Sequence, residues 1–198
     1  MSGAAPSCAA LLLTGGASRR FGSAKGELEW NGMRLADRGA RLLAEVASPV
    51  LEVGPGYSHL DALWEDEPGS GPLAALVAGA AALEARHALD RPVLVLAVDL
   101  PFVEISFLRL LARAPMADAV VPRVDGRAQP LCARYSVQAL ARARELVARG
   151  ARSMQALLDV LDVDWLDEAD WQAVATPRTF ADIDTPGDAA RFGLRPRG

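Results

Sequence analysis

Residues 11–28 read LLLTGGASRRFGSAKGEL, a stretch that passes from apolar residues to glycines and then to positive charges. The apolar run from Ala9 to Leu13 predicts a strand that is covered on both faces. Gly15 and Gly16 follow at once, and because glycine has no Cβ, backbone N–H groups at this turn can surround a phosphate. Cationic side chains come next, at Arg19, Arg20 and Lys25. The stretch therefore predicts a strand that opens into a loop suited to a triphosphate.

Two common phosphate-binding motifs are absent from this loop. A P-loop requires G-x-x-x-x-G-K-[ST], but Phe21 stands at the fifth position after Gly16, and no lysine follows Gly22 directly. The dinucleotide fingerprint G-x-G-x-x-G is absent as well. A tight turn whose arginines face water remains the structural alternative to a phosphate site at this point.

Further apolar runs follow the first one along the chain. They cover residues 50–53, 92–98 and 117–121, and they alternate with helical patterns at 35–46, 73–86, 105–112 and 137–148. Alternating strands and helices predict an α/β fold with a mainly parallel sheet. Such sheets bind ligands beyond the carboxyl ends of their strands. The residues after each run, including Gly54 and Asp99, are therefore candidate site residues.

The last third of the sequence is less regular. Asp125-Gly126 is a hairpin signal, and the short apolar stretch after it predicts an antiparallel addition to the sheet. Residues 159–171, DVLDVDWLDEADW, predict a solvated helix end followed by a short strand. We find no repeat and no linker, so we expect one domain over residues 1–198.

Composition limits the classes of function. The chain has 198 residues, of which 51% are hydrophobic and 23% charged, and its formal net charge is -4. This charge balance argues against a protein surface that binds nucleic acid or membranes, because such a surface would be basic. Cys8 and Cys132 are too few for a disulfide framework, and CAALLL near the start has neither a basic n-region nor a cleavage site. We therefore expect a cytoplasmic location.

The opening stretch resembles the signature G-G-x-S-x-R-[MF]-G-x-x-K of the nucleotidyltransferases that act on molybdopterin. The matching positions are Gly15, Gly16, Ser18, Arg20, Phe21, Gly22 and Lys25. Later blocks resemble the same family in the same order: EDEPGSGPLAAL, LAVDLPFV, AQPLCARY and FADIDTPGDAARF. The resemblance implies a three-layer α/β/α nucleotidyltransferase fold with a Rossmann-like sheet. It also implies transfer of GMP from GTP to molybdopterin, with pyrophosphate as the other product.

The resemblance assigns roles to individual residues. Catalytic roles fall on Arg20, Lys25 and Asp99, which would neutralise phosphate charge or hold the metal. Nucleotide contacts fall on Leu13, Thr14, Gly15, Gly16, Lys25, Gly54, Asp66 and Asp99. Such chemistry depends on positioning and charge neutralisation more than on a covalent nucleophile. The resemblance also implies transient contact with molybdenum cofactor biosynthesis proteins and with the molybdoenzymes that receive the product.

Carboxylates supply the expected metal ligands. Asp99 ends the strongest predicted strand, and Mg²⁺ typically takes one or two carboxylates together with water. Asp182 and Asp184 flank Ile183, so in an extended segment both point the same way, and Asp184 is our second predicted ligand. The alternative for Asp184 is the N-cap of the helix that follows it. The sequence leaves open which of the two aspartates fills which role.

The preferred base is less well defined than the reaction. Thr14-Gly15-Gly16 resembles the guanylyl pattern, but Thr14 replaces its usual alanine and Gly54 stands where an asparagine often follows the second strand. Asp182 and Asp184 also replace asparagines of that pattern and are common in the cytidylyl relatives. The alternatives are therefore a cytidylyltransferase that uses CTP, a sugar or phospholactate nucleotidyltransferase, or a catalytically idle nucleotide-binding module.

Three other polar residues carry no functional prediction. His59 lies in an expected loop and His87 near a helix end, and neither has ligand spacing around it. Cys132 lies in an apolar stretch with no histidine nearby, so we expect a packed core thiol.

Overall fold

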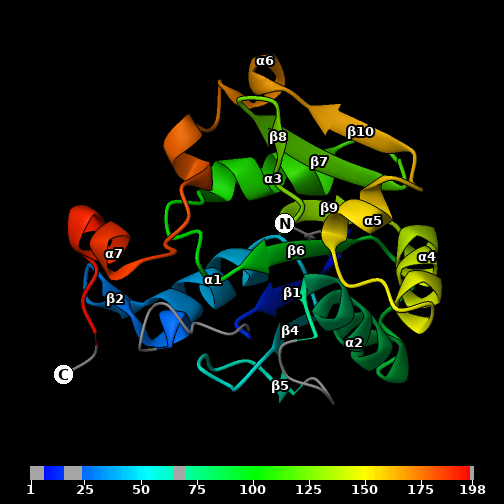
Figure 1. The fold of residues 1–198 in the computed structure, drawn as a ribbon, viewed down its shortest axis with the longest axis horizontal. Coiled ribbons are helices and arrows are strands. Elements are labelled where there is room, and N and C mark those ends of the chain that lie inside the picture. Colours follow the sequence, from blue (N-terminus) through cyan, green and yellow to red (C-terminus); the bar gives the residue numbers. More distant parts are fainter. Residues whose placement is uncertain (1–6, 16–23, 65–69, 197–198) are drawn as a thin grey trace, which may run out of the picture.

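The strand predicted by the opening stretch lies in the middle of the sheet (Figure 1). The computed structural model describes residues 7–15, 24–64 and 70–196. Strand β1 (Ala9–Leu13) pairs in parallel with β4 (Val50–Val53) on one side and with β6 (Val93–Ala97) on the other. These three strands lie where the apolar runs predict them.

The eight-stranded sheet has the order β10-β7-β9-β6-β1-β4-β5, with β8 paired to β7 outside this path. In Figure 1, β10 is at the top of the sheet and β5 at the bottom. The outer strands are β5 (Ala62–Leu63), β7 (Ala119–Val124), β8 (Arg127–Ala128), β9 (Cys132–Tyr135) and β10 (Val163–Leu166). A separate hairpin is formed by β2 (Glu29–Trp30) and β3 (Met33–Arg34).

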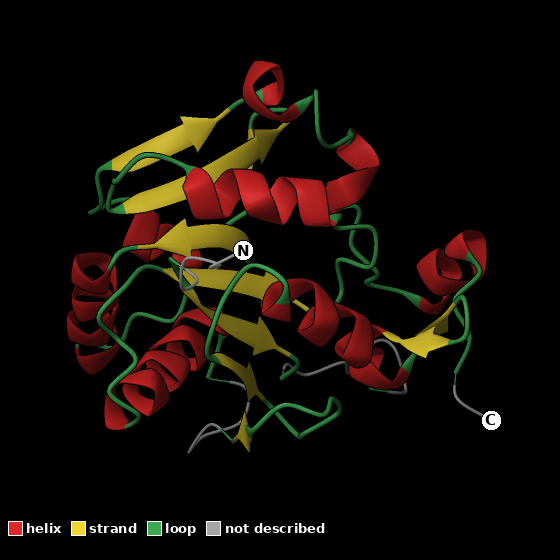
Figure 2. Ribbon diagram, turned by 180° about the vertical axis from the view of Figure 1, so that it is seen from behind, coloured by secondary structure: helices red, strands yellow, loops and turns green. Residues whose placement is uncertain are grey.

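Helices cover both faces of the sheet. On the near side in Figure 1 lie α2 (Pro72–Ala85), α4 (Val137–Ala148) and α5 (Met154–Leu158). On the other side, which faces the viewer in Figure 2, lie α1 (Leu35–Ala44) and α3 (Ile105–Arg113), with α6 (Glu168–Trp171) at the rim. The predicted three-layer α/β/α architecture with a mainly parallel sheet is confirmed.

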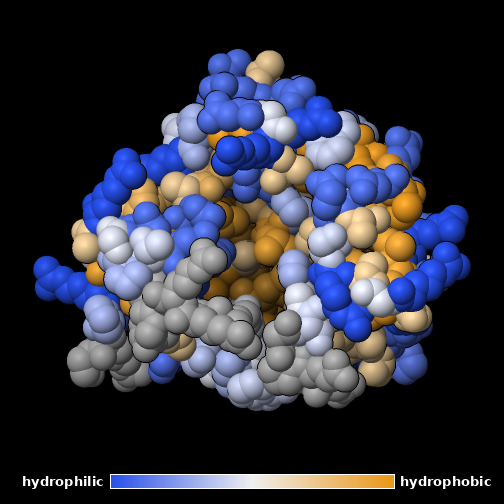
Figure 3. Space-filling view, in the orientation of Figure 1, coloured by the Kyte–Doolittle hydropathy of each residue, from blue (hydrophilic) through white to orange (hydrophobic). Residues whose placement is uncertain are grey.

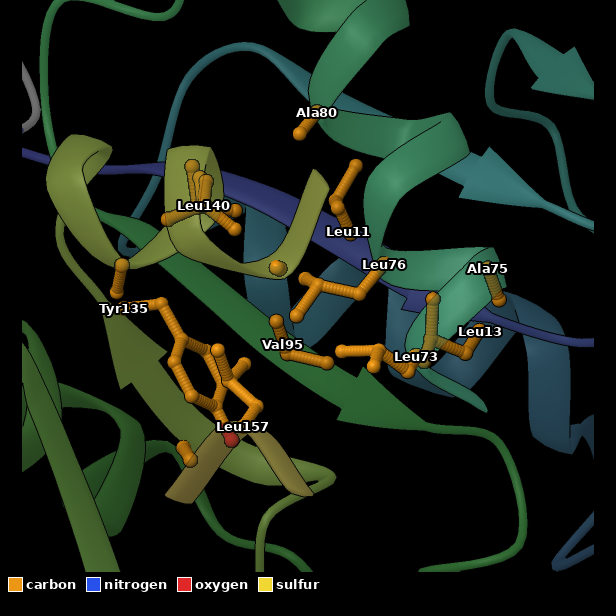
Figure 4. Close-up of a cluster of buried hydrophobic side chains, with 14 of the residues drawn as sticks. Leu11, Leu13, Leu73, Ala75, Leu76, Ala80, Val95, Tyr135, Leu140 and Leu157 are labelled. Carbon is orange, nitrogen blue, oxygen red and sulfur yellow. The ribbon is translucent and has the colours of Figure 1, made fainter. Parts of the chain in front are cut away.

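Alternation along β1 divides its side chains between two cores, because successive residues of a strand face opposite ways. Leu11 and Leu13 pack with α2, α4 and α5 in the first core, which Figure 4 shows in close-up. Ala10 and Leu12 pack with α1 and α3 in the second core. A Cβ on Gly79 of α2 would lie 2.5 Å from Cδ1 of Leu11, so glycine at this position lets the helix lie close to the sheet.

The predicted antiparallel addition is also confirmed. Asp125 and Gly126 have φ angles of 49° and 74°, as a tight hairpin turn requires, and they join β7 to β8. β9 then runs antiparallel to both β6 and β7. Together, β8 and β9 make the sheet mixed rather than wholly parallel.

The acidic stretch 159–171 is less solvated than its composition indicates. The predicted short strand is β10, but Trp171 is only 1% exposed and packs edge-on against Phe180, 5.2 Å away between ring centroids. Cys132 is fully buried, as predicted, and burial raises the pKa of its thiol to about 12. Within the described ranges, no helix has both the length and the apolar character needed to cross a membrane.

We expect Leu11→Ala to destabilise the protein by about 3–4 kcal/mol, because a fully buried leucine in the central strand leaves a cavity that rigid neighbours on both sides cannot fill. Thermal and urea unfolding measure this change. Leu89→Ala, in a partly exposed loop position, is the matched control and should cost less than half as much. Equal losses for the two variants would contradict the central place of β1 in the core.

Candidate active site

The carboxyl ends of β1, β4 and β6 meet at one edge of the sheet, because Leu13 is in register with both Val53 and Ala97. Thr14 and Gly15 leave this edge from β1, and Gly54 leaves it from β4. The Val98 amide donates to the Leu13 carbonyl at 3.0 Å, which places Asp99 just beyond the same edge. Figure 3, in the orientation of Figure 1, shows a hollow near the middle of the molecule, with an apolar floor and hydrophilic residues around it.

Lys25 joins two of the predicted carboxylates across long stretches of sequence. Its Nζ donates to Asp99 Oδ2 at 3.0 Å and to Asp184 Oδ1 at 2.8 Å. The Lys25 side chain is 16% exposed, whereas that of Asp184 is 64% exposed, so the ammonium lies below an open carboxylate. Lys25 is also the only lysine in the sequence; every other one of the 21 Lys and Arg residues is arginine.

The electrostatics of this cluster keep Lys25 charged. Burial alone would lower the pKa of Lys25, but the charge of Asp99 and the hydrogen bonds to Asp184 and Asp99 outweigh that effect, so the pKa is raised. Asp182 lies close enough to interact with the same groups. Its pKa is raised by burial and by repulsion from Asp184 and Asp99, against the attraction of Lys25. Among the residues that the structure describes, two carboxylates thus contact the one ammonium group and a third influences it from nearby, so negative charge is in excess there.

A small third core holds these side chains in place. Leu28, Val98 and Ile183 are all buried in it. Each of them is close in sequence to one member of the cluster: Leu28 follows Lys25 by three residues, and Val98 and Ile183 directly precede Asp99 and Asp184. The Ile183 amide also donates to the Asp99 carbonyl at 3.0 Å. The same apolar contacts therefore bring three distant segments together.

The alternative role considered for Asp184, the N-cap of the last helix, is wrong. That helix, α7 (Pro186–Phe192), is capped by Thr185, whose side chain accepts from the Asp188 amide and whose own amide donates to Asp188. Neither Asp182 nor Asp184 caps it. Because Thr185 has this role, Asp184 is left to contact Lys25 while Ile183 points into the core.

Several predicted residues lie outside the part of the chain that the structure describes. They are Gly16, Ser18, Arg19, Arg20, Phe21, Gly22 and Asp66, in residues 16–23 and 65–69. The other predicted site residues are described. Five of them lie at the same edge of the sheet: Leu13, Thr14, Gly15, Gly54 and Asp99. Lys25 contacts Asp99, and Asp184 contacts Lys25. His59 lies apart from this cluster, 3.7 Å from Asp37.

Sequence reasoning missed one charged residue at this edge. Glu52 interrupts the apolar run of β4, is fully buried, and accepts a 2.5 Å hydrogen bond from Thr14 Oγ1. Burial acts to raise its pKa, but hydrogen bonds from Ser58, Thr14 and the Tyr57 amide outweigh this and lower it. The sequence did contain a signal for this residue, because Glu52 is an acid inside an otherwise apolar strand.

Comparisons with known proteins place the chain among relatives. The family model described as "MobA-like NTP transferase domain" matches residues 10–165. A protein named probable molybdenum cofactor guanylyltransferase from Chloroflexus aggregans is 34% identical over 193 residues, covering 90% of this chain and 89% of the relative. One of the same name from Opitutus terrae is 38% identical over 169 residues, covering 81% and 82%.

A solved structure is also similar. The molybdopterin-guanine dinucleotide biosynthesis protein A of Archaeoglobus fulgidus superposes with a TM-score of 0.72 at 26% identity, covering 92% of this chain and 95% of that one. The family model spans most of the sequence and includes β1, β4, β6 and the edge where they meet. With the predicted resemblance thus confirmed, the chain belongs to the MobA-like NTP transferase family.

Proposed function

We propose that this protein transfers GMP from GTP to molybdopterin, releasing pyrophosphate and forming the guanine dinucleotide form of the cofactor. The observation that carries the proposal is the Lys25 ammonium held between Asp99 and Asp184 at the carboxyl edge of the sheet. Guanine is favoured over cytosine because the relatives reported above are named guanylyltransferases and because the loop reads Thr14-Gly15-Gly16.

The residues present fit a magnesium ion. Asp99 and Asp184 offer carboxylate oxygens that lie 3.0 and 2.8 Å from the same Lys25 Nζ, and Asp182 adds negative charge nearby. Hard oxygen ligands suit Mg²⁺, which is held by one or two carboxylates and completes its shell with water and phosphate oxygens. Asp99 and Asp184 would hold the ion, which when bound supplies positive charge that offsets repulsion between the two polyanionic substrates.

The chain's own groups account for the rest of the reaction. A terminal phosphate of the acceptor attacks the α-phosphorus of the nucleotide, the bond to the β-phosphate oxygen breaks, and pyrophosphate leaves. Main-chain amides at Gly15 and Gly16 would contact the nucleotide, while Arg20 and Lys25 would stabilise the triphosphate and the charge that develops on pyrophosphate. A raised pKa keeps Lys25 cationic throughout the neutral range.

Two further properties are part of the proposal. The free cysteines Cys8 and Cys132 are both buried, which supports the reducing cytoplasm as the location. Transfer of the product to molybdoenzymes would need transient contacts with them and with other proteins of cofactor biosynthesis.

Lys25→Ala and Asp99→Ala should each lower turnover by about 10²- to 10³-fold, because each removes a charged group placed at the phosphates. Lys25→Arg should recover little, since a planar guanidinium cannot replace a compact ammonium held between two carboxylates. Release of pyrophosphate measures turnover, and circular dichroism checks folding. Arg142→Ala, on the exposed face of α4, is the charge-matched control and should leave turnover unchanged. Near-normal turnover in the Lys25→Ala variant would overturn its assigned role.

Incubation with molybdopterin, each nucleoside triphosphate and Mg²⁺ should yield the guanine dinucleotide alone, identified by mass spectrometry. Chelation of the metal by EDTA should abolish product, and added Mg²⁺ should restore it, because the clustered carboxylates then regain their counter-ion. A cytosine dinucleotide as the main product would replace the guanylyl proposal with the cytidylyl one. Product formation in EDTA at the full rate would contradict the metal role of Asp99 and Asp184.

A further inference from the structure

A buried carboxylate lies directly beneath the edge where the nucleotide is proposed to bind. Glu52 is in β4, two residues before Gly54, and it is 0% exposed. Leu51 and Val53 on either side of it belong to the first core, so the Glu52 side chain points to the opposite face of the sheet. Burial of a charge costs free energy unless hydrogen bonds compensate for it, so the partners of Glu52 decide what it does.

Among the described residues, five donors converge on this carboxylate, and none of these five is a cationic group. Oε1 accepts from Thr14 Oγ1 at 2.5 Å and from the amides of Gly56 and Tyr57 at 3.0 and 2.7 Å. Oε2 accepts from the Ser58 amide at 2.8 Å and from Ser58 Oγ at 2.6 Å. A carboxylate has about four acceptor sites, so these bonds leave none for a substrate. Glu52 can therefore affect the reaction only through the segments that it holds.

One of these segments is the end of β1. The Thr14 hydroxyl, held by Glu52, occupies the space into which a side chain at position 54 would extend. A Cβ on Gly54 would overlap this hydroxyl and would lie 2.6 Å from the Gly15 nitrogen. Gly54 also has a φ of 147°, which other residues rarely adopt. Thr14 and Gly54 thus form a matched pair, and only main-chain groups are presented at position 54.

The other segment leads to Lys25. Glu52 fixes the backbone of residues 56–58, and the ring of Tyr57 lies over Gly26, where a Cβ would come within 2.5 Å of Tyr57 Cδ2. Gly26 follows Lys25 in the short 3₁₀ helix η1 (Lys25–Glu27). The contacts of one carboxylate therefore reach both the Thr14–Gly15 turn and the helix that carries the lysine.

We infer that Glu52 is a positioning residue for the nucleotide site, which aligns the Thr14–Gly15 turn with the loop of residues 54–58 and with Lys25. The inference rests on the proposed function, because it takes this edge to be where the nucleotide binds. Glu52 does not touch the substrate. It sets the spacing of the main-chain and cationic groups that do.

Isothermal titration with GTP and Mg²⁺ tests the inference without requiring turnover. Thr14→Val removes the hydroxyl at constant shape, and Glu52→Gln replaces an accepting oxygen with a donor that faces other donors. Each should raise the Kd for GTP by about tenfold or more, while Thr14→Ser, which keeps the hydroxyl, should stay within about threefold of the wild type. In the transfer assay, the KM for GTP should rise for Thr14→Val while kcat falls less than about threefold, because Asp99 and Lys25 remain.

Ser136→Ala is the control for lost stability. Ser136 is buried and caps α4, next to the amino end of β6 and therefore opposite the proposed site. This variant should lower Tm and leave the Kd for GTP unchanged, whereas a purely structural Glu52 would make Glu52→Gln behave in the same way.

The outcomes of this series are distinct from those of the transfer assay. If Thr14→Val is folded and binds GTP within about twofold of the wild type, the inference is overturned, even if Glu52→Gln does not fold. A wild-type protein that binds no nucleoside triphosphate also overturns it. If the wild-type protein binds GTP but transfers no GMP to molybdopterin, only the proposed function is contradicted. The Kd values of the Thr14 variants then still test the role of Glu52.

Discussion

The small apolar cluster of Leu28, Val98 and Ile183 is the constraint on which the candidate site depends. The two large cores hold helices against the sheet. A sheet of this kind can present many different sets of functional residues at the ends of its strands. The third core is different, because each of the three residues is adjacent or nearly adjacent to a member of the charged cluster. Burial of these apolar side chains fixes the spacing of Lys25, Asp99 and Asp184, so the hydrophobic effect rather than the ion pairs determines where the charges lie.

The charged cluster is unbalanced in a way that suits a phosphate-transfer site. In the described part of the chain, Lys25 is the one cation that contacts Asp99 and Asp184, and the pKa of the neighbouring Asp182 is raised by burial and by these two acidic neighbours. Ion pairs that serve only stability are usually matched in charge, because an excess of one sign repels itself. The proposed magnesium ion would offset this excess of negative charge.

Much of the fold could be predicted, because the runs at 9–13 and 92–98 are apolar at every residue and the helical patterns between them are clear. The contact between Lys25 and Asp184 could not be obtained from spacing, since 159 residues separate them and a shared core at Ile183 joins them. Glu52 was missed because its partners at residues 56–58 are mainly backbone amides, which every sequence has. Trp171 was read as part of an acidic, solvated stretch, but its ring fills the space beside Phe180.

The presence of one lysine among so many arginines has a practical consequence. Reagents that acylate ε-amines have a single side chain to modify in this protein, and acylation there would remove the charge that Asp99 and Asp184 share. Because the same carboxylates keep the amine protonated, it should react slowly while they hold it and faster once other cations occupy them. The rate at which the Lys25 amine is acylated therefore reports whether Asp99 and Asp184 are bound to it or to another cation.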